Sequence, residues 1–325
     1  MFDVAISQVT TLRWDLSREL ARLVDHGFAS LALWRPKLPD TGAVAAAEAL
    51  AARGRRASSL QGAGGYTGGA GRTFAESVAD AVEAIETAAI LGGASAATRP
   101  PVLVLHAGCR GGHTRTHATR LLHDALARLV PVARREGVVL GLEPLHAAAE
   151  PGCDFIAGLD EALAVVAAHD AGTVGLVLDL WHFGDDPALV ARLPRLAAAA
   201  ALVQVADRCG TPAPTGDRLP AGHGTLPLER LVAALVQHGY RGDFEFDPVG
   251  EAVEVLGYDG VLRDTALVAD AWAERLATHD AVLRADAAHD GGMVPAADRR
   301  DQFRRAGSGA GSRRSQASSQ VVSRG

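Results

Sequence analysis

Two acidic residues stand directly after short apolar runs of this sequence. Asp179 follows the run 174–178, and Glu143 follows the run 138–142. A short apolar run without a polar face is typical of a strand that is buried on both sides in a parallel sheet. His182 stands three residues after Asp179. We therefore expect an acid at the carboxyl end of this strand and an imidazole in the loop that leaves it.

Two later apolar runs contain polar side chains of their own. Gln204 interrupts the run 201–206, where a buried amide needs a hydrogen-bonding partner. In the segment 244–247, Glu245 and Asp247 alternate with phenylalanine. The period of two along a strand puts both acids on one face.

The order of the predicted elements indicates a closed barrel. Apolar runs alternate eight times with helical segments, several of which end at a glycine. This alternation predicts an α/β fold, a single (β/α)8 TIM barrel over residues 1–285, because an open doubly wound sheet would need fewer strands or a second domain. From about residue 286 the periodicity is lost and Gly, Ser and Arg dominate, which predicts a disordered tail over residues 286–325. The expected strands cover residues 2–7, 28–34, 56–60, 101–106, 138–143, 174–179, 201–208 and 244–248.

The polar side chains at the strand ends are expected to converge. In a barrel of this kind the carboxyl ends of all strands meet on one face, and that face carries the chemistry. Several oxygen-bearing side chains around one point are what a hard divalent cation binds. Without a cation, carboxylates so close together would repel, and at least one would take up a proton. The sequence therefore predicts a divalent-metal site formed by Glu143, Asp179, Gln204 and Asp247.

Four further residues are candidates for contacts with a substrate. His106 ends the fourth expected strand, where it either points into the site or packs against the next strand. Trp34 ends the second strand and is a candidate for the pocket wall or for the core. Arg208 ends the seventh expected strand and Arg218 lies in the loop after it, where a guanidinium could neutralise an oxyanion or an acidic group of a substrate.

The composition excludes several classes of function. The chain has 325 residues and a formal net charge of −6, which argues against binding of nucleic acid through basic patches. No apolar run is long enough to span a membrane, and the N-terminus lacks the features of a secretory signal. The three cysteines form no CxxC pair, which argues against a disulfide framework. We therefore expect a cytoplasmic protein with no nucleic-acid or membrane partner.

Five short motifs give the chain a family resemblance over about residues 1–285. The motifs are Leu142–His146, Asp179–His182, Val203–Asp207, Pro220–Gly224 and Gly239–Gly242. With these motifs the chain resembles the xylose isomerase-like TIM barrel superfamily, the sugar phosphate isomerase/epimerase family. The resemblance implies a small sugar-like substrate, a divalent metal cofactor and assembly as a homodimer or homotetramer.

The resemblance also implies roles for individual residues. In the ketose epimerases of the family, Glu, Asp, His and Glu from strands five to eight hold one metal, and the two Glu exchange protons with the substrate. Glu143 and Asp179 match the first two ligands, and His182 matches a histidine that contacts the substrate. Gln204 stands where the family has His, and an amide oxygen favours Mn²⁺ or Mg²⁺ over Zn²⁺ or Co²⁺. Asp247 matches the last Glu but is one methylene shorter, so neighbouring Glu245 is an alternative.

The resemblance implies proton transfer beside a carbonyl. We expect an isomerase or epimerase of a sugar, keto-sugar or related polyol, in which a cation stabilises an enediolate and Glu143 and Asp247 move the proton. Two alternatives are a metal-dependent dehydratase or lyase on a keto-sugar or keto-cyclitol, and a non-catalytic barrel that binds a metabolite. An apurinic endonuclease-like phosphodiesterase is disfavoured because Leu219 stands where that family has His.

Overall fold

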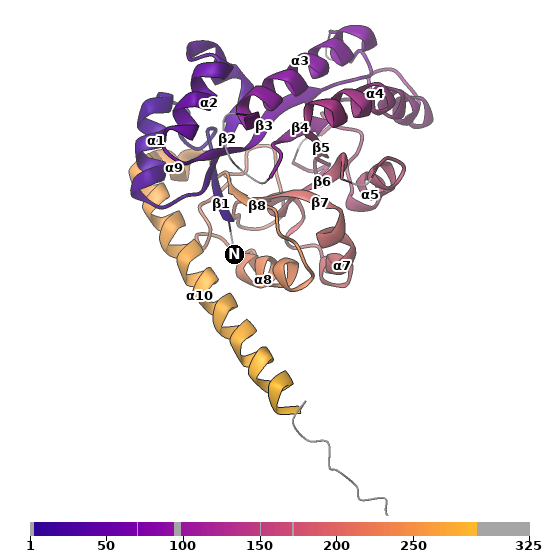
Figure 1. Ribbon diagram of the computed structural model, residues 1–325. Coiled ribbons are helices and arrows are strands. Elements are labelled where there is room, and N and C mark those ends of the chain that lie inside the picture. Colours follow the sequence, from indigo (N-terminus) through magenta and orange to yellow (C-terminus); the bar gives the residue numbers. More distant parts are fainter. Residues whose placement is uncertain (1–2, 70, 94–98, 150, 171, 291–325) are drawn as a thin grey trace, which may run out of the picture. The chain divides into compact units, whose positions relative to one another are not determined.

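Eight parallel strands close into a barrel in the computed structural model (Figure 1). The structure describes residues 3–69, 71–93, 99–149, 151–170 and 172–290, and side chains as far as residue 278. Each strand pairs with the next in sequence order, and β8 pairs with β1. The predicted TIM barrel is therefore confirmed. The strands are β1 (Asp3–Ser7), β2 (Ser30–Trp34), β3 (Arg56–Gly64), β4 (Val102–His106), β5 (Val139–Leu142), β6 (Val174–Asp179), β7 (Ala200–Val205) and β8 (Asp243–Phe246).

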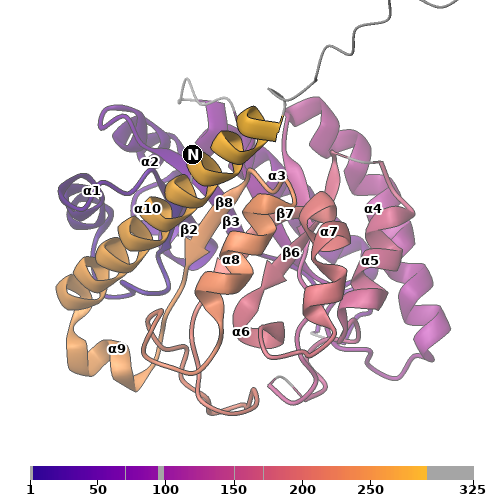
Figure 2. The ribbon, with the colours of Figure 1, turned by 90° about the horizontal axis from the view of Figure 1, so that it is seen from below.

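Helices surround the barrel (Figure 2). Local caps fix where several of them begin. Asp15 accepts a hydrogen bond from the backbone of Arg18 at the start of α1, and Thr73 and Glu76 bond each other's backbone N–H before α3. The helical elements are α1 (Leu16–Asp25), the 3₁₀ helix η1 (Arg35–Asp40), α2 (Ala43–Ala51), α3 (Phe74–Gly93), α4 (Arg115–Glu136), α5 (Leu159–Ala167), α6 (Leu180–Phe183), α7 (Leu189–Ala199), α8 (Leu228–Gln237), α9 (Glu251–Leu256) and α10 (Tyr258–Asp290).

Apolar packing outside the barrel and a small apolar layer inside it hold the strands. The outer core lies between strands and helices, and the inner layer consists of Val102, Val104, Val177 and Leu202. Gly141 of β5 fits this interior because a Cβ there would lie 2.6 Å from Val177 and 2.7 Å from Val102. A larger side chain at residue 141 would push β5 away from both neighbouring strands.

Several element boundaries differ from the predictions, β7 among them, which ends at Val205. β3 continues to Gly64, past the predicted end at residue 60. The predicted loop after Asp179 is helix α6, because the Asp179 carboxylate accepts a hydrogen bond from the N–H of Trp181 and caps it. Helix α10 runs to Asp290 and so includes the first residues of the predicted tail. Residues 291–325 lie outside the described part of the chain, and residues from Asp280 onward form a separate unit.

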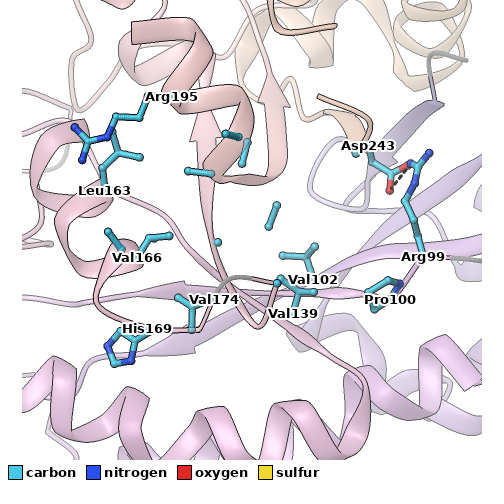
Figure 3. Close-up of a pocket in the computed structure, with 18 residues that line it drawn as sticks. Arg99, Pro100, Val102, Val139, Leu163, Val166, His169, Val174, Arg195 and Asp243 are labelled. Atoms are coloured by element: carbon cyan, nitrogen blue, oxygen red, sulfur yellow. Dashed lines mark ion pairs between the residues drawn. The ribbon is translucent and has the colours of Figure 1, made fainter. Parts of the chain in front are cut away.

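The amino-terminal end of the barrel has an apolar cavity of about 520 Å³ (Figure 3). Its wall includes the first residues of β4, β5 and β6, which are Val102, Val139 and Val174. Arg99 and Asp243, which also line the cavity, form an ion pair of 3.7 Å. This cavity therefore lies at the other end of the strands from Asp179. Among the described residues, no helix has the length and apolarity needed to cross a bilayer.

Candidate active site

Three predicted residues meet at the carboxyl end of the barrel. Glu143, Asp179 and His182 are buried, and each offers one potential ligand atom within 4.8 Å of the others. Glu143 directly follows β5, Asp179 ends β6, and His182 lies on α6. The Nε2 atom of His182 is 3.6 Å from Oδ2 of Asp179. Closure of the barrel thus brings together side chains from separate strand ends, as expected.

Gln204 lies beside this group. Strand register pairs Gln204 with Asp179 on one side and with Glu245 on the other. Its Nε2 donates to Oε1 of Glu245 at 3.4 Å, whereas its buried Oε1 has no hydrogen-bond partner among the residues that the structure describes. A buried acceptor without a donor is costly, and an amide oxygen is a natural ligand for a hard cation. Together with the neighbouring carboxylates, this orphaned oxygen fits a divalent cation.

The two acids of the last strand differ in their surroundings. Glu245 is fully buried and accepts hydrogen bonds from Ser59 at 2.6 Å and from Gln61. Asp247 directly follows β8, and both of its carboxylate oxygens accept from Nη2 of Arg218, at 2.8 and 2.6 Å. Glu245 is therefore the strand-eight acid adjacent to Gln204, and Asp247 is engaged by an arginine. Neither acid belongs to the group within 4.8 Å.

Arg218 lies inside the cluster. Its Nη1 donates to Oδ2 of Asp179 at 2.8 Å, and its guanidinium carbon lies 5.2 Å from the centroid of the Trp181 ring. The backbone of Arg218 forms an isolated antiparallel bridge with Val249. This bridge holds the long loop after β7 against the segment after β8 and directs the guanidinium into the site.

The other predicted contact residues occupy different positions. His106 lies at the edge of the cluster, with its Nε2 3.7 Å from Oε2 of Glu143. Arg208 is buried and donates to the main-chain oxygens of Trp181 and Gly210 and to the Asp185 carboxylate. Its guanidinium ties loops together and is not brought into the cluster. Trp34 is half-buried at the end of β2, and its backbone N–H donates to the side-chain oxygen of Gln8 at 3.0 Å.

Comparisons with known proteins agree with this geometry. The family model described as "xylose isomerase-like TIM barrel" matches residues 20–261. The chain belongs to this family. No curated protein sequence matches the chain.

Solved structures share the fold at low sequence identity. The IOLI protein with a bound zinc atom is 18% identical, with a TM-score of 0.70 over 85% of this chain and 99% of that chain. The 3-keto-D-glucoside 4-epimerase YcjR from E. coli is 18% identical, with a TM-score of 0.63 over 81% and 98%. The family 2 AP endonuclease from Brucella melitensis is 20% identical, with a TM-score of 0.62 over 79% and 98%. At these identities the likeness shows the family's fold and leaves the reaction open.

The pKa values of the two acids in the cluster, Glu143 and Asp179, are shifted in opposite directions. Burial, together with the negative charge of Asp179, raises the pKa of Glu143 well above its usual range. Burial acts in the same direction on Asp179, but Arg218 and His182 outweigh it and lower the pKa of Asp179. Glu143 is thus suited to hold a proton while Asp179 stays ionised.

Both histidines of the cluster are neutral near pH 7. Burial lowers the pKa of His182 to about 4, against the attraction of Asp179. Burial and the nearby His182 lower the pKa of His106 to about 4 as well. A neutral imidazole can accept a hydrogen bond or bind a metal.

Sequence reasoning missed several residues that support the site. Ser59 and Gln61 of β3 hold Glu245, and the Trp181 ring lies under Arg218 and donates from Nε1 to the backbone oxygen of Asp217. The polar residues in and directly after the expected third strand were the sequence feature that could have indicated this contact with Glu245. The role of Trp181 depends on a loop that comes from elsewhere in the chain, so no local pattern indicates it.

The burial of Glu245 predicts a pH dependence of stability in the metal-free protein. Burial raises the pKa of Glu245 to about 7, against hydrogen bonds from Ser59, Gln204 and Gln61, whereas a glutamate in an unfolded chain has a pKa of about 4.3. Between these values the folded state binds the proton more tightly. The free energy of unfolding should therefore fall as the pH rises from about 4 to about 7, by at most roughly 1.4 kcal/mol per pH unit from this group.

Urea unfolding in the presence of a chelator, at a series of pH values, measures this effect. Glu245→Gln should flatten the profile because glutamine cannot titrate. A variant profile as steep as that of the wild type would show that Glu245 is not responsible.

Proposed function

We propose that the protein is a divalent-metal-dependent isomerase or epimerase of a sugar, keto-sugar or related polyol. The observation that carries this proposal is the cluster of Glu143, Asp179 and His182 beside the orphaned oxygen of Gln204. Solved structures with the fold include a D-psicose 3-epimerase and an L-ribulose 3-epimerase, at 13% and 16% identity. Their names support the same class of reaction for this chain.

Four side chains would hold the cation. Glu143, Asp179 and Gln204 supply oxygens from strand ends five, six and seven, and we assign the fourth place to Glu245 because it neighbours Gln204 in the barrel register. This assignment replaces Asp247 of the sequence prediction, since Arg218 binds both carboxylate oxygens of Asp247. Oxygen ligands favour Mn²⁺ or Mg²⁺, with Co²⁺ and Zn²⁺ as weaker alternatives. When bound, such a cation polarises a carbonyl and stabilises negative charge on the substrate oxygen.

The residues of the chain move the proton. Burial raises the pKa of Glu143 and the pKa of the strand-eight acid Glu245, which suits both groups to general acid–base catalysis. One of them removes the proton from the carbon beside the carbonyl. The other returns a proton to the substrate from the opposite face. His182, held by its Nδ1 to the N–H of His146 at 3.4 Å, orients a substrate hydroxyl.

A cavity at the mouth bears on the substrate class. It has a volume of about 440 Å³ and includes His182 in its wall, so it borders the cluster. Its wall has four acidic residues and one arginine, and Arg192 already forms ion pairs with two of those acids. Glu161 and Asp185 likewise pair with Arg115 and Arg208. Among the described residues the wall therefore offers a phosphate no unpaired arginine, which favours a neutral polyhydroxylated substrate over a phosphorylated one. The acids are Asp160, Glu161, Asp185 and Asp186.

Hydrogen exchange from solvent tests the proposed reaction. The protein, loaded with Mn²⁺, is incubated in D₂O with ketoses, keto-cyclitols and their phosphates, and the products are analysed by mass spectrometry and NMR. We expect deuterium at the carbon beside the carbonyl for a neutral member of the set, and none with Glu143→Gln. Loss of water from the substrate would indicate the dehydratase alternative. Absence of exchange and of product throughout the set contradicts the proposal, and nicking of abasic DNA would support the endonuclease.

A further inference from the structure

Arg218 is bound by two acids in an unequal way. Asp247 accepts Nη2 through both carboxylate oxygens, at 2.8 and 2.6 Å, and its main-chain oxygen accepts Nε at 3.4 Å. Only Nη1 is bound to Asp179, by one hydrogen bond of 2.8 Å. Breaking that single bond would leave the guanidinium held by Asp247 and stacked over Trp181.

Asp179 has one oxygen that faces the rest of the cluster. Its Oδ1 accepts from the N–H of Trp181 at 2.8 Å and so caps α6. Its Oδ2 is bound by Arg218 and also lies 3.6 Å from Nε2 of His182. Oδ2 is therefore the atom that a divalent cation would bind, and it already carries a positive partner.

The charges of the site explain why an arginine is present. Asp179 is fully buried, and Asp247 is 8% exposed. Buried carboxylates without a counter-charge are costly, and the Arg218 guanidinium compensates both. A divalent cation bound to the same oxygen of Asp179 would be repelled by that guanidinium.

We infer that Arg218 competes with the divalent cation for Asp179 and that Asp247 retains the arginine beside the site once the cation has bound. In the metal-free state Nη1 neutralises Asp179. A cation on Oδ2 of Asp179 would displace Nη1 from that oxygen, and the contacts of Nη2 with Asp247 would keep the guanidinium beside the site. Arg218 is thereby a positioning residue that sets the metal affinity, and the inference rests on the proposed metal site.

Titration calorimetry with Mn²⁺ at fixed pH and ionic strength tests this competition. Arg218→Gln removes the competing charge, so Mn²⁺ should bind about 10-fold more tightly than to the wild type. Arg218→Lys keeps the positive charge but lacks the planar guanidinium group, and its Mn²⁺ affinity should remain close to that of the wild type. Arg192→Gln is the matched control, since Arg192 lies at the same mouth and pairs with Asp160 and Asp186; its Mn²⁺ affinity should not change. Equal or weaker binding by folded Arg218→Gln overturns the inference.

A second variant keeps the test decisive if Arg218→Gln does not fold. Asp247→Asn loosens the retaining contact, so Arg218 should bind Asp179 more fully and Mn²⁺ affinity should fall several-fold. An Mn²⁺ affinity equal to that of the wild type would overturn the inference. The metal site itself is tested separately. It is contradicted if the wild type binds no Mn²⁺, or if Asp179→Asn binds Mn²⁺ as well as the wild type does. In either case the proposed function fails, and the inference fails with it. If Asp179→Asn weakens Mn²⁺ binding but the Arg218 and Asp247 variants bind Mn²⁺ as the wild type does, only the competition is refuted.

Discussion

Asp179→Asn should lose bound metal and turnover together. Asp179 is fully buried, and its Oδ2 faces His182 and Arg218. Asparagine can keep the bond from the N–H of Trp181 through its oxygen, but its NH₂ group would then replace Oδ2. That group cannot bind a cation and would face the N–H donor of Arg218. Turnover should fall by roughly 10³-fold or more, since Lewis-acid stabilisation is worth several kcal/mol and each ~1.4 kcal/mol is tenfold in rate.

Metal analysis by mass spectrometry and the deuterium-exchange assay measure the two effects on one preparation. The wild type should hold about one divalent ion per chain, and Glu143→Gln should resemble Asp179→Asn. Asp124→Asn is the control, because Asp124 is an exposed carboxylate on α4, outside the cluster and the cavity. Retention of metal and activity in both cluster variants would refute the site.

Lys37→Met should destabilise the fold more than any surface change. Lys37 donates to the Glu19 carboxylate and to the main-chain oxygens of Thr11 and Trp14, at 3.1 and 2.8 Å. Glu19 is buried and also accepts from Gln8 and Thr11, each at 2.7 Å. Methionine would leave a buried carboxylate without its counter-charge, which costs about 3–5 kcal/mol of unfolding free energy.

Urea unfolding followed by circular dichroism measures this loss. Burial raises the pKa of Glu19, and Lys37 opposes that rise. The variant should therefore regain stability at low pH, where Glu19 is protonated, and adding Glu19→Gln should restore part of the loss at neutral pH. Arg135→Met is the control, since Arg135 forms a surface ion pair with the adjacent Glu136, and it should cost less than about 1 kcal/mol. An equal effect of the two single variants would contradict the role of the buried pair.

The position of this buried pair links stability to the site. Glu19 lies on α1, Lys37 lies on η1 after β2, and Gln8 follows β1. Gln8 also accepts a hydrogen bond from the N–H of Trp34. The network thus fixes the connections that leave the first two strands at the same end of the barrel as Asp179. Those connections form part of the rigid frame around the cluster.

The sequence alone determined the order of strands and helices and the strand ends at which Glu143 and Asp179 stand. Hydrophobic periodicity is local, so a run such as 174–178 indicates a buried strand wherever the rest of the chain lies. Closure of eight such units into a barrel then requires the strand ends to share one face. The meeting of Glu143, Asp179 and His182 could be predicted for this reason.

Only the tertiary structure decided which neighbours these residues have. Whether Glu245 or Asp247 lies beside Gln204 depends on the register between β7 and β8, and Arg218 and Arg208 lie on one loop yet are turned to different partners. Register and loop conformation arise from contacts between segments far apart in sequence, and no periodic pattern records them.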